Sequence, residues 1–350
     1  MQKQKSIKHL LIIRSSAMGD VAMMVHPIIA LNKVYPNLKI TILTNSFYKP
    51  FFEDLPNTTI LPLDKKGKHK GIFGLQKLAN EIKALGIDAI ADFHGVLRTH
   101  VLKVLFQFSK IPFVQIEKGR AEKKALTRSE NKVFRQLKSS HQRYIEVLHK
   151  LGLEVVLEKT HILPKKALPN SIRQHFENNT KRWIGIAPFA QHKGKVYPLE
   201  KMESVIQQLN ETHNYQIFLF GGGQKETKLL KQIAYSFTNV TNVAGQFSFS
   251  EELALISNLD LMLSMDSGNG HLAAMFAVPI LTIWGVTHPY TGYEPFGQVP
   301  ENNLIPDLKK FPLVPTSIYG NTFPEGYEKA AASISTEVIC SNVDLALNTG

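Results

Sequence analysis

The sequence of 350 residues holds a single cysteine, Cys340, and no long apolar run. One cysteine excludes a disulfide framework and any zinc site built on cysteines. A membrane-spanning helix needs about 18 consecutive apolar residues, and no stretch approaches that length. Near the amino end the apolar run Leu10–Ile13 stops at Arg14, which is too short for a signal-peptide core. These absences predict a soluble, cytoplasmic protein.

Several catalytic signatures are missing as well. The sequence contains no GxxxxGK[ST] loop, no HExxH and no GxSxG, which argues against a P-loop NTPase, a zinc protease and a typical serine hydrolase. It also lacks a DxD pair that could hold a divalent metal beside a diphosphate. We therefore expect neither a metal nor a cofactor, and a bound diphosphate would need a lysine and a helix N-terminus to offset its charge.

The chain is basic, with 41 Lys and Arg against 29 Asp and Glu and a net charge of +12. Residues 1–165 hold 28 basic and 13 acidic residues, or +15, whereas residues 166–350 hold 13 and 16, or −3. The Pro-rich stretch Pro164–Pro169 between them is typical of a linker. Such a charge predicts an anionic partner, but no helix-turn-helix, zinc or RNA-binding aromatic motif points to nucleic acid.

Both halves alternate apolar runs, typical of strands buried on two faces, with helical patterns of about ten residues. This alternation predicts an α/β fold of two Rossmann-like domains with parallel sheets facing a cleft, residues 1–165 and 166–350. A final helix at about 329–347 could pack back on the N-terminal domain. The predicted strands are 9–14, 39–43, 59–63, 88–93, 112–116, 183–187, 216–220, 239–243, 259–264 and 279–284, and the other predicted helices are 27–35, 75–85, 95–108, 198–211, 225–235, 250–257 and 267–276.

In such sheets a ligand binds beyond the carboxyl ends of the strands, so the loops there are the candidates for chemistry. In the first half, RSSAMGD places Asp20 near a helix start, where its carboxylate is ionised; a helix-capping role explains its position equally well. DFHGVLRT places Arg98 in a first helical turn, and alone it reads best as a solvated arginine.

The second half carries the stronger signals. Lys195 lies in a strand-to-helix loop, and FGGGQKE sets three glycines before Glu226, as phosphate-cradling turns do. The strongest is Asp266–His271 (DSGNGH), where a strand ends and a helix begins. Free backbone amides and the Ser267 hydroxyl there would form an anion-binding site. A turn that only caps the helix would not need two glycines and a histidine at these positions.

Taken in order, HLLIIRSSAMGDVAM, IAPFAQHKGKVYP and LMLSMDSGNGHLAAMFAVPILTIWGVTHP resemble glycosyltransferase family 9, the lipopolysaccharide heptosyltransferases. The resemblance runs through most of the chain and implies the GT-B architecture. It also implies metal-independent transfer of heptose, with inversion, from ADP-heptose to the growing inner core of lipopolysaccharide.

The resemblance implies roles for single residues. Asp20 matches the aspartate taken as general base, and Lys195 matches the lysine on the donor phosphates. Arg98 falls in the block near the acceptor. The remaining donor-side matches are Glu226 at the ribose, Phe247 near the adenine, and Asp266, Ser267, Gly268 and His271 at the diphosphate and sugar. The chain departs from the family pattern at Ala190–Lys193 and at the Gly-Asn-Gly after Ser267, which leaves the donor's identity open.

The stretch Lys118–Arg143 has nine Lys and Arg against two Glu. It is either a solvated loop or, as a cluster, a contact for an anionic saccharide–lipid acceptor or the inner membrane leaflet, with Lys118 and Arg120 among the candidate acceptor-binding residues. Because the charge excess lies in the half that carries Asp20, we expect it to serve the acceptor rather than the donor diphosphate. The rival hypotheses are the same fold with another nucleotide-sugar donor, and a non-catalytic sugar-nucleotide-binding protein.

Overall fold

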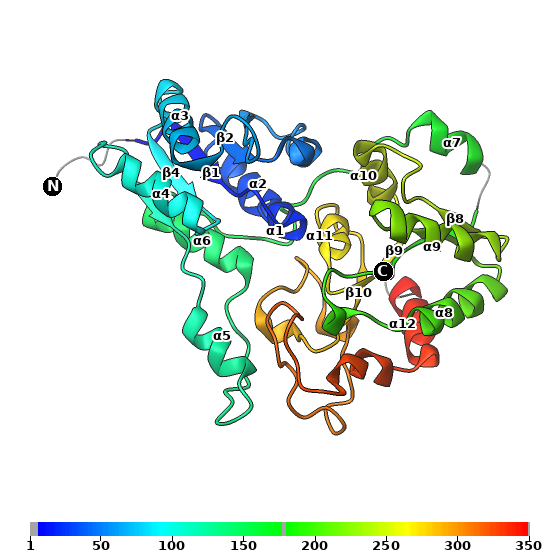
Figure 1. Ribbon diagram of the computed structural model, residues 1–350. Coiled ribbons are helices and arrows are strands. Elements are labelled where there is room, and N and C mark those ends of the chain that lie inside the picture. Colours follow the sequence, from blue (N-terminus) through cyan, green and yellow to red (C-terminus); the bar gives the residue numbers. More distant parts are fainter. Residues whose placement is uncertain (1–5, 177–179, 349–350) are drawn as a thin grey trace. The chain divides into compact units, whose positions relative to one another are not determined.

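The computed structural model describes residues 6–176 and 180–348 (Figure 1). The chain divides into two compact units. Unit 1 comprises Met1–Lys118 and Ser140–Ile162, and unit 2 comprises Gly119–Ser139 and Leu163–Gly350. Unit 1 has 20 Lys and Arg against 11 Asp and Glu, a net charge of +9, and unit 2 has 21 against 18, a net charge of +3. None of the helices in these described ranges is both long and apolar enough to cross a bilayer.

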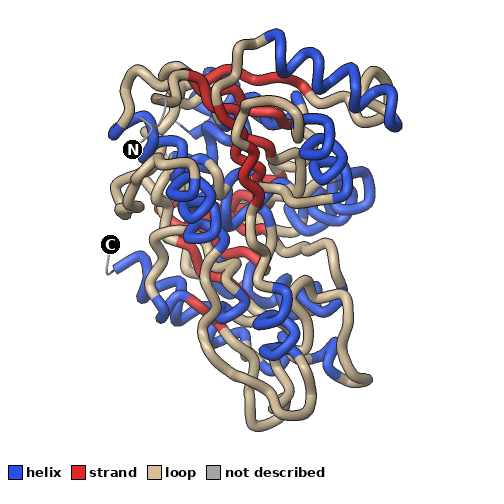
Figure 2. The backbone as a smooth tube through the Cα atoms, turned by 90° about the vertical axis from the view of Figure 1, so that its left-hand side faces the viewer, coloured by secondary structure: helices blue, strands red, loops and turns tan. Residues whose placement is uncertain are grey.

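Unit 1 is built on a five-stranded parallel sheet in the order β3-β2-β1-β4-β5. Leu10 of β1 pairs with Ile40 of β2 on one side and with Ala89 of β4 on the other, so the strand order reverses at β1. The strands, coloured red in Figure 2, are β1 (His9–Ile13), β2 (Lys39–Thr44), β3 (Thr58–Pro62), β4 (Ala89–Asp92) and β5 (Phe113–Gln115). The helices are α1 (Met18–Ala22), α2 (Val25–Val34), α3 (Gly71–Ala84), α4 (Leu97–Phe106) and α6 (Ser140–Lys150), with the 3-10 turn η1 (Ser46–Phe51).

The sheet of unit 1 is covered on both faces, because successive side chains of a strand point to opposite sides. Leu11 and Ile13 of β1 pack in one core cluster with Leu78 of α3 and Leu102 of α4. The intervening Leu10 and Ile12 are also buried, and α2 and α6 pack together elsewhere in the unit. The continuous apolar run of β1 is therefore the consequence of a strand with no solvent face.

Unit 2 holds a six-stranded parallel sheet in the order β11-β10-β9-β6-β7-β8. Counted along the chain this is the 3-2-1-4-5-6 order of the doubly wound Rossmann fold, with the reversal between β6 and β9. The strands are β6 (Arg182–Ala187), β7 (Tyr215–Leu219), β8 (Val240–Asn242), β9 (Leu261–Met265), β10 (Ile280–Ile283) and β11 (Asn303–Leu304). The helices are α5 (Arg120–Thr127), α7 (Asn170–Phe176), α8 (Leu199–Glu211), α9 (Gly223–Tyr235), α10 (Phe249–Ser257), α11 (Gly268–Ala274) and α12 (Thr336–Asn348), and the 3-10 turns are η2 (Lys193–Lys195), η3 (Pro289–Thr291), η4 (Pro300–Asn302), η5 (Tyr327–Lys329) and η6 (Ala331–Ser333).

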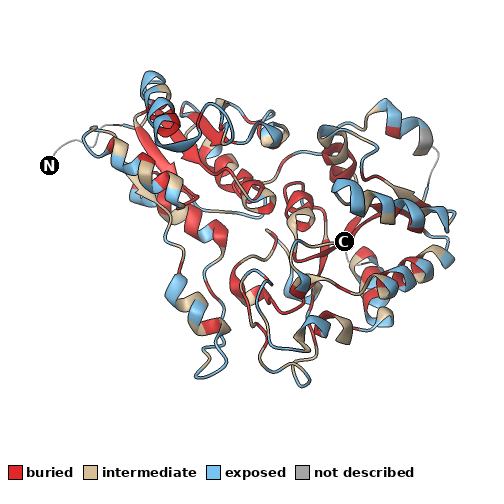
Figure 3. Ribbon diagram, in the orientation of Figure 1, coloured by how far each residue is buried: buried red, intermediate tan, exposed pale blue. Residues whose placement is uncertain are grey.

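The last helix, α12, belongs to the core of unit 2. Its buried residues Ile339, Val343 and Leu347 lie in one cluster with the strands and with α8 and α9. Figure 3 shows the buried strands of both sheets in red between helices whose outer faces are exposed. The sequence had suggested that a final helix at 329–347 packs on the N-terminal domain; the helix begins later, at Thr336, and packs within unit 2.

The segment Gly119–Ser139, which the sequence analysis placed in the first domain, falls in unit 2. The Lys123 ammonium lies 4.7 Å from the centre of the Tyr293 ring and donates to its hydroxyl at 3.0 Å. Lys132 donates to the backbone carbonyls of Leu313 and Pro315, and burial lowers its pKa to about 8. This arm is docked on unit 2, so it is not the free basic loop that its composition suggests.

All ten predicted strands are present, each displaced by no more than two residues at either end. β11, which has only two residues, was not predicted, and the sequence pattern predicted no helix where α5, α6 and α7 form. The helix start expected near Asp20 corresponds to α1.

Candidate functional site

In each unit the reversal of strand order marks the carboxyl edge where a ligand would bind. In unit 1 the flanking loops follow Ile13 of β1 and Asp92 of β4, and in unit 2 they follow Ala187 of β6 and Met265 of β9. The loops that the sequence predicted to carry functional residues therefore lie at the carboxyl edges of the two sheets.

Asp20 lies in the first turn of α1, three residues after the N-cap residue Ala17. Its Oδ2 accepts the Ala17 amide at 3.2 Å and forms an ion pair with the Arg14 guanidinium. Arg14 is itself oriented by the carbonyls of Ser16, at 2.8 Å from Nε, and Phe93, at 2.7 Å from Nη1. Both of these contacts of Asp20 fall on Oδ2, so the side chain closes the helix start through one of its two carboxylate oxygens.

His94 stands beside this pair at the end of β4. Its Nδ1 lies 3.2 Å from the Ser15 hydroxyl. Burial, followed by the neighbouring charges of Arg14, Lys65 and Lys118, lowers the pKa of His94 to about 3, so the imidazole is neutral. The loop is held by Asp92, whose Oδ1 accepts the amides of His94 at 2.8 Å and Gly95 at 3.1 Å.

Three further cations border the same edge of unit 1. Lys65 donates to the Ser15 carbonyl at 3.2 Å, and burial lowers its pKa, with a smaller contribution from Arg98. Arg98, at the start of α4, donates to the His69 carbonyl at 2.8 Å. Lys118 passes close to Gly95, where a Cβ would lie 3.2 Å from its Cε.

Two of the three predicted acceptor-binding residues lie in the same unit as Asp20, and the third does not. Arg98 and Lys118 lie in unit 1 with Asp20, whereas Arg120 is an exposed residue of α5 in unit 2. Arg14, Lys65 and His94 were not singled out. Arg14 ends a predicted strand, and Lys65 and His94 each follow one, so their position at the carboxyl edge was the available signal.

In unit 2 the two loops at the switch point meet through an ion pair. Lys195 Nζ lies 2.8 Å from Asp266 Oδ2, and the Thr287 hydroxyl donates to the same oxygen at 2.8 Å. The Lys195 side chain is 15% exposed and that of Asp266 is 5% exposed. The Asp266 carboxylate therefore orients the Lys195 ammonium, and the lysine side chain remains partly accessible to solvent.

Glycines fix where Lys195 lies. Gly194 donates to the Gly320 carbonyl at 3.1 Å and accepts the Val286 amide at 2.7 Å. A Cβ on Gly285 would lie 2.0 Å from the Gly194 carbonyl oxygen, and one on Gly320 would lie 2.5 Å from Lys195 Cγ. Only residues without a side chain allow these backbones and the lysine stem to approach so closely.

The Asp266–His271 block is a strand end followed at once by α11. Ser267 is the N-cap residue, Gly268 the first helical residue, and His271 is buried in the next turn. The Ser267 hydroxyl oxygen is buried and has no hydrogen-bond partner among the described residues. A buried hydroxyl beside helix-start amides fits an anionic oxygen.

Glu226 and Phe247 lie on other loops of unit 2. Glu226 is in the first turn of α9, and its Oε2 accepts the Gly222 amide at 2.8 Å, so it stabilises the glycine turn. Phe247 is half-buried directly before Ser248, the N-cap of α10.

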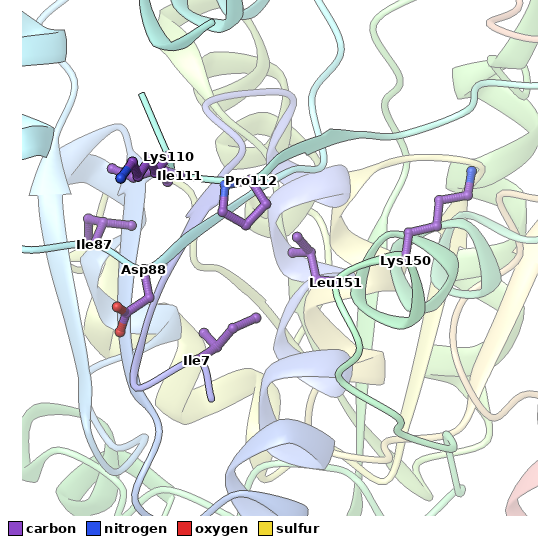
Figure 4. Close-up of a pocket in the computed structure, with 8 residues that line it drawn as sticks. All are labelled: Ile7, Ile87, Asp88, Lys110, Ile111, Pro112, Lys150 and Leu151. Carbon is purple, nitrogen blue, oxygen red and sulfur yellow. The ribbon is translucent and has the colours of Figure 1, made fainter. Parts of the chain in front are cut away.

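One pocket of unit 1 lies away from these residues. It has a volume of about 360 Å³ and is lined by residues that precede β1, β4 and β5, at the amino edge of the sheet, and by Lys150 and Leu151 at the end of α6 (Figure 4). Asp88, which lines it, accepts the amides of Lys8 and His9 at 3.0 Å each. Across the described ranges, no group of three or more His, Cys, Asp or Glu is arranged to hold a metal ion.

Comparison with known proteins gives a family and a fold. The family described as "Glycosyltransferase family 9 (heptosyltransferase)" matches residues 76–305. The lipopolysaccharide core heptosyltransferase OpsX of Haemophilus influenzae is 26% identical over 301 residues, covering 85% of this chain and 83% of that protein. A family 9 glycosyltransferase of Veillonella parvula superposes with a TM-score of 0.73 at 19% identity, covering 98% of both chains.

A second solved structure, the Escherichia coli heptosyltransferase WaaC with ADP-2-deoxy-2-fluoro heptose, superposes with a TM-score of 0.64 at 16% identity, covering 96% of this chain and 99% of that one. The two parallel sheets and these superpositions establish the GT-B fold that the sequence predicted. Because the family match covers well over half of the sequence, the chain belongs to glycosyltransferase family 9, the heptosyltransferase family, and is a glycosyltransferase.

Proposed function

We propose that this protein transfers a heptose, with inversion, from ADP-heptose to an anionic core saccharide of lipopolysaccharide, at the cytoplasmic face of the inner membrane. The observation that carries the proposal is the pairing of charged groups at the carboxyl edges of the two sheets, Arg14 with Asp20 and Lys195 with Asp266. The lipopolysaccharide heptosyltransferase relatives and the solved structure with an ADP-heptose analogue support the choice of donor and acceptor.

Unit 2 supplies a site for the donor diphosphate. The Lys195 ammonium, which is paired with Asp266, the Ser267 hydroxyl and the first amides of α11 offer several directed hydrogen-bond donors. As the bond to the anomeric carbon breaks, negative charge grows on the leaving phosphate, and preorganised donors stabilise it there. We assign the sugar and phosphate contacts to Asp266, Gly268 and His271, the ribose to Glu226 and the adenine side to Phe247.

Unit 1 supplies the base. Asp20 Oδ1 accepts the proton of the attacking acceptor hydroxyl, while Oδ2 stays bound to Arg14 and to the Ala17 amide. A carboxylate is a weak base, but it suffices when the proton leaves late, after the hydroxyl oxygen has begun to bond to the anomeric carbon. Neutral His94 offers an imidazole beside the same carboxylate without adding a competing positive charge.

The acceptor binds the cationic border of unit 1. Lys65, Arg98 and Lys118 surround the Asp20 edge and match a saccharide that carries carboxylate or phosphate groups. Arg120 lies in the docked arm of unit 2, and we leave it outside this set.

Two measurements test the proposal. Thermal unfolding with ADP, UDP and GDP identifies the nucleotide, and we expect ADP alone to stabilise the protein. Transfer from ADP-heptose to a delipidated core saccharide should then be nearly abolished in Asp20→Asn, with the ADP-induced shift unchanged. A larger shift with UDP or GDP would replace the donor with another nucleotide sugar, and near-normal turnover in Asp20→Asn would remove this residue from the role of base.

A further inference from the structure

The outer face of α4 carries apolar side chains where a soluble helix usually presents polar ones. Leu97 is 81% exposed, Val104 is 58% exposed and Phe108, just past the helix end, is 93% exposed. With the partly buried Val101 they are spaced at intervals of four, three and four residues, which places them on one side of the helix. These four residues are here named the α4 stripe. The opposite side, with Leu102 and Phe106, packs into the core.

A second pair of exposed apolar residues begins the neighbouring helix. Ile72 is 55% exposed and Phe73 is 88% exposed in the first turn of α3. The loop before them is tied to the start of α4 by the hydrogen bond from Arg98 to the His69 carbonyl. Helices that follow parallel strands begin at the carboxyl edge of the sheet, so these residues and Leu97 lie at the same edge as Asp20.

The surroundings of these residues are basic. Residues 93–116 contain Arg98, Lys103 and Lys110 but no Asp or Glu, and the loop 65–70 contains four lysines. Two acidic groups, one in the loop before α3 and one in α3, are engaged within the unit. Asp64 accepts the three amides of residues 66–68, and Glu81 lies 2.8 Å from the Lys68 ammonium. An apolar stripe in a segment that carries cations and no carboxylates is complementary to a lipid bilayer with anionic headgroups.

We infer that the α4 stripe, with Ile72 and Phe73, is the surface through which unit 1 lies on an anionic membrane. Phe73, Leu97 and Phe108 enter the interface between headgroups and acyl chains, and Lys103 and Lys110 contact the headgroup phosphates. The biological role of this contact rests on the proposed function, because the contact would hold the Asp20 edge beside a lipid-linked acceptor. It replaces residues 118–143 as the expected site of membrane contact.

Vesicle co-sedimentation tests this surface without requiring catalysis. The wild-type protein should bind vesicles of phosphatidylethanolamine and phosphatidylglycerol and bind phosphatidylcholine vesicles weakly. The triple variant Phe73→Ser, Leu97→Ser, Phe108→Ser should lose at least about tenfold in partition, since three apolar anchors are removed. Lys103→Glu with Lys110→Glu should abolish the preference for anionic vesicles.

Matched controls are available elsewhere on the chain. Tyr235, at the end of α9 in unit 2, is 94% exposed, and Tyr235→Ser should leave partition unchanged. Lys228→Glu with Lys231→Glu, on the exposed side of the same helix, controls for net charge. Thermal unfolding of each variant verifies its fold.

The outcomes distinguish a failure of the membrane-surface inference from a failure of the proposed function. Transfer to a delipidated saccharide should be the same in the triple variant and the wild type. If wild type does not bind anionic vesicles, or if the triple variant binds them as tightly, the inference is wrong whatever the enzyme transfers. If no transfer to any acceptor is found while vesicle binding follows this pattern, the proposed function fails and the membrane surface stands.

Discussion

Replacing Asp266 with asparagine should destabilise the ligand-free protein and increase its response to a diphosphate. The change keeps the size of the side chain but removes the charge that faces Lys195 Nζ at 2.8 Å. Breaking a buried ion pair costs about 3–5 kcal/mol because the remaining charge has lost its partner. Lys195 is 15% exposed and retains some contact with water, so we expect a loss near the lower end of that range, about 3 kcal/mol.

A loss of about 3 kcal/mol corresponds to a fall in Tm of roughly 6–12 °C for a unit of this size. Differential scanning calorimetry measures it directly. A diphosphate that reaches Lys195 would restore the missing negative charge, so the stabilisation by saturating ADP should be larger in Asp266→Asn than in wild type. Asp307→Asn, which removes the partner of the exposed Lys310 at 3.8 Å, is the control and should shift Tm by less than about 2 °C.

A double-mutant cycle decides whether the pair itself is responsible. Lys195→Met leaves Asp266 buried with only the Thr287 hydroxyl, so it should also destabilise the protein. The double variant Asp266→Asn, Lys195→Met should be more stable than the sum of the two losses predicts, by about 2 kcal/mol. Strict additivity, or an unchanged Tm in Asp266→Asn, would refute the reasoning, because no unpaired charge would then have been created.

Three further outcomes follow from single contacts. Arg14→Ala should lower the rate of transfer by about tenfold to a hundredfold, with partial recovery in Arg14→Lys, because the guanidinium orients Asp20; steady-state kinetics measures kcat and KM. Gly285→Ala should cost at least about 3 kcal/mol in urea unfolding, since its Cβ would lie 2.0 Å from the Gly194 carbonyl oxygen and the backbone must move. Burial, and secondarily Lys132, lowers the pKa of His288 to about 4 from 6.5, so the unfolded chain binds its proton more tightly. Stability should therefore fall as the pH drops from about 6.5 towards 4, and His288→Gln should flatten that dependence in urea unfolding across the same range.

The strands could be predicted from the sequence because parallel strands covered on both faces leave continuous apolar runs. His9–Ile13 and Leu261–Met265 are buried throughout, and no polar alternation competes with the signal. β11 escaped prediction because two residues, Asn303 and Leu304, are too short to form a run. Its existence depends on pairing with β10, which is a tertiary contact.

The loops of the candidate site could be predicted for a different reason. Once the sheets are parallel, every strand-to-helix loop lies at one edge, and the polar residues in those loops become candidates. The sequence does not show which of them meet. The contact between Lys195 and Asp266 joins positions 71 residues apart, and Lys65 reaches Ser15 across two strands of the sheet. Both depend on the order of strands, which no local pattern specifies.

The docking of the arm Gly119–Ser139 was not predictable from its composition. Seven basic residues against two acidic ones suggest a solvated segment, and nothing local indicates that Lys132 will find two backbone carbonyls or that Lys123 will lie over an aromatic ring. Its assignment to unit 2 moves a net charge of +5, and the boundary at Leu163 also moves Lys165, so the electrostatic division of the chain changes from +15 and −3 to +9 and +3.

This revised division bears on how each unit would select its ligand. The net charge of unit 2 is only +3, and its central lysine is already paired with Asp266, so long-range attraction contributes little to holding a diphosphate there. Under the proposed function that role falls to directed atoms, namely the Lys195 ammonium, the Ser267 hydroxyl and the amides that begin α11. In unit 1 the net charge is larger, and it comes from many separate side chains rather than from one directed group. Salt ions in solution can screen the field of such exposed charges. Under the proposed function, geometry would therefore select the donor, whereas a diffuse positive field would gather an anionic acceptor and the surface that bears it.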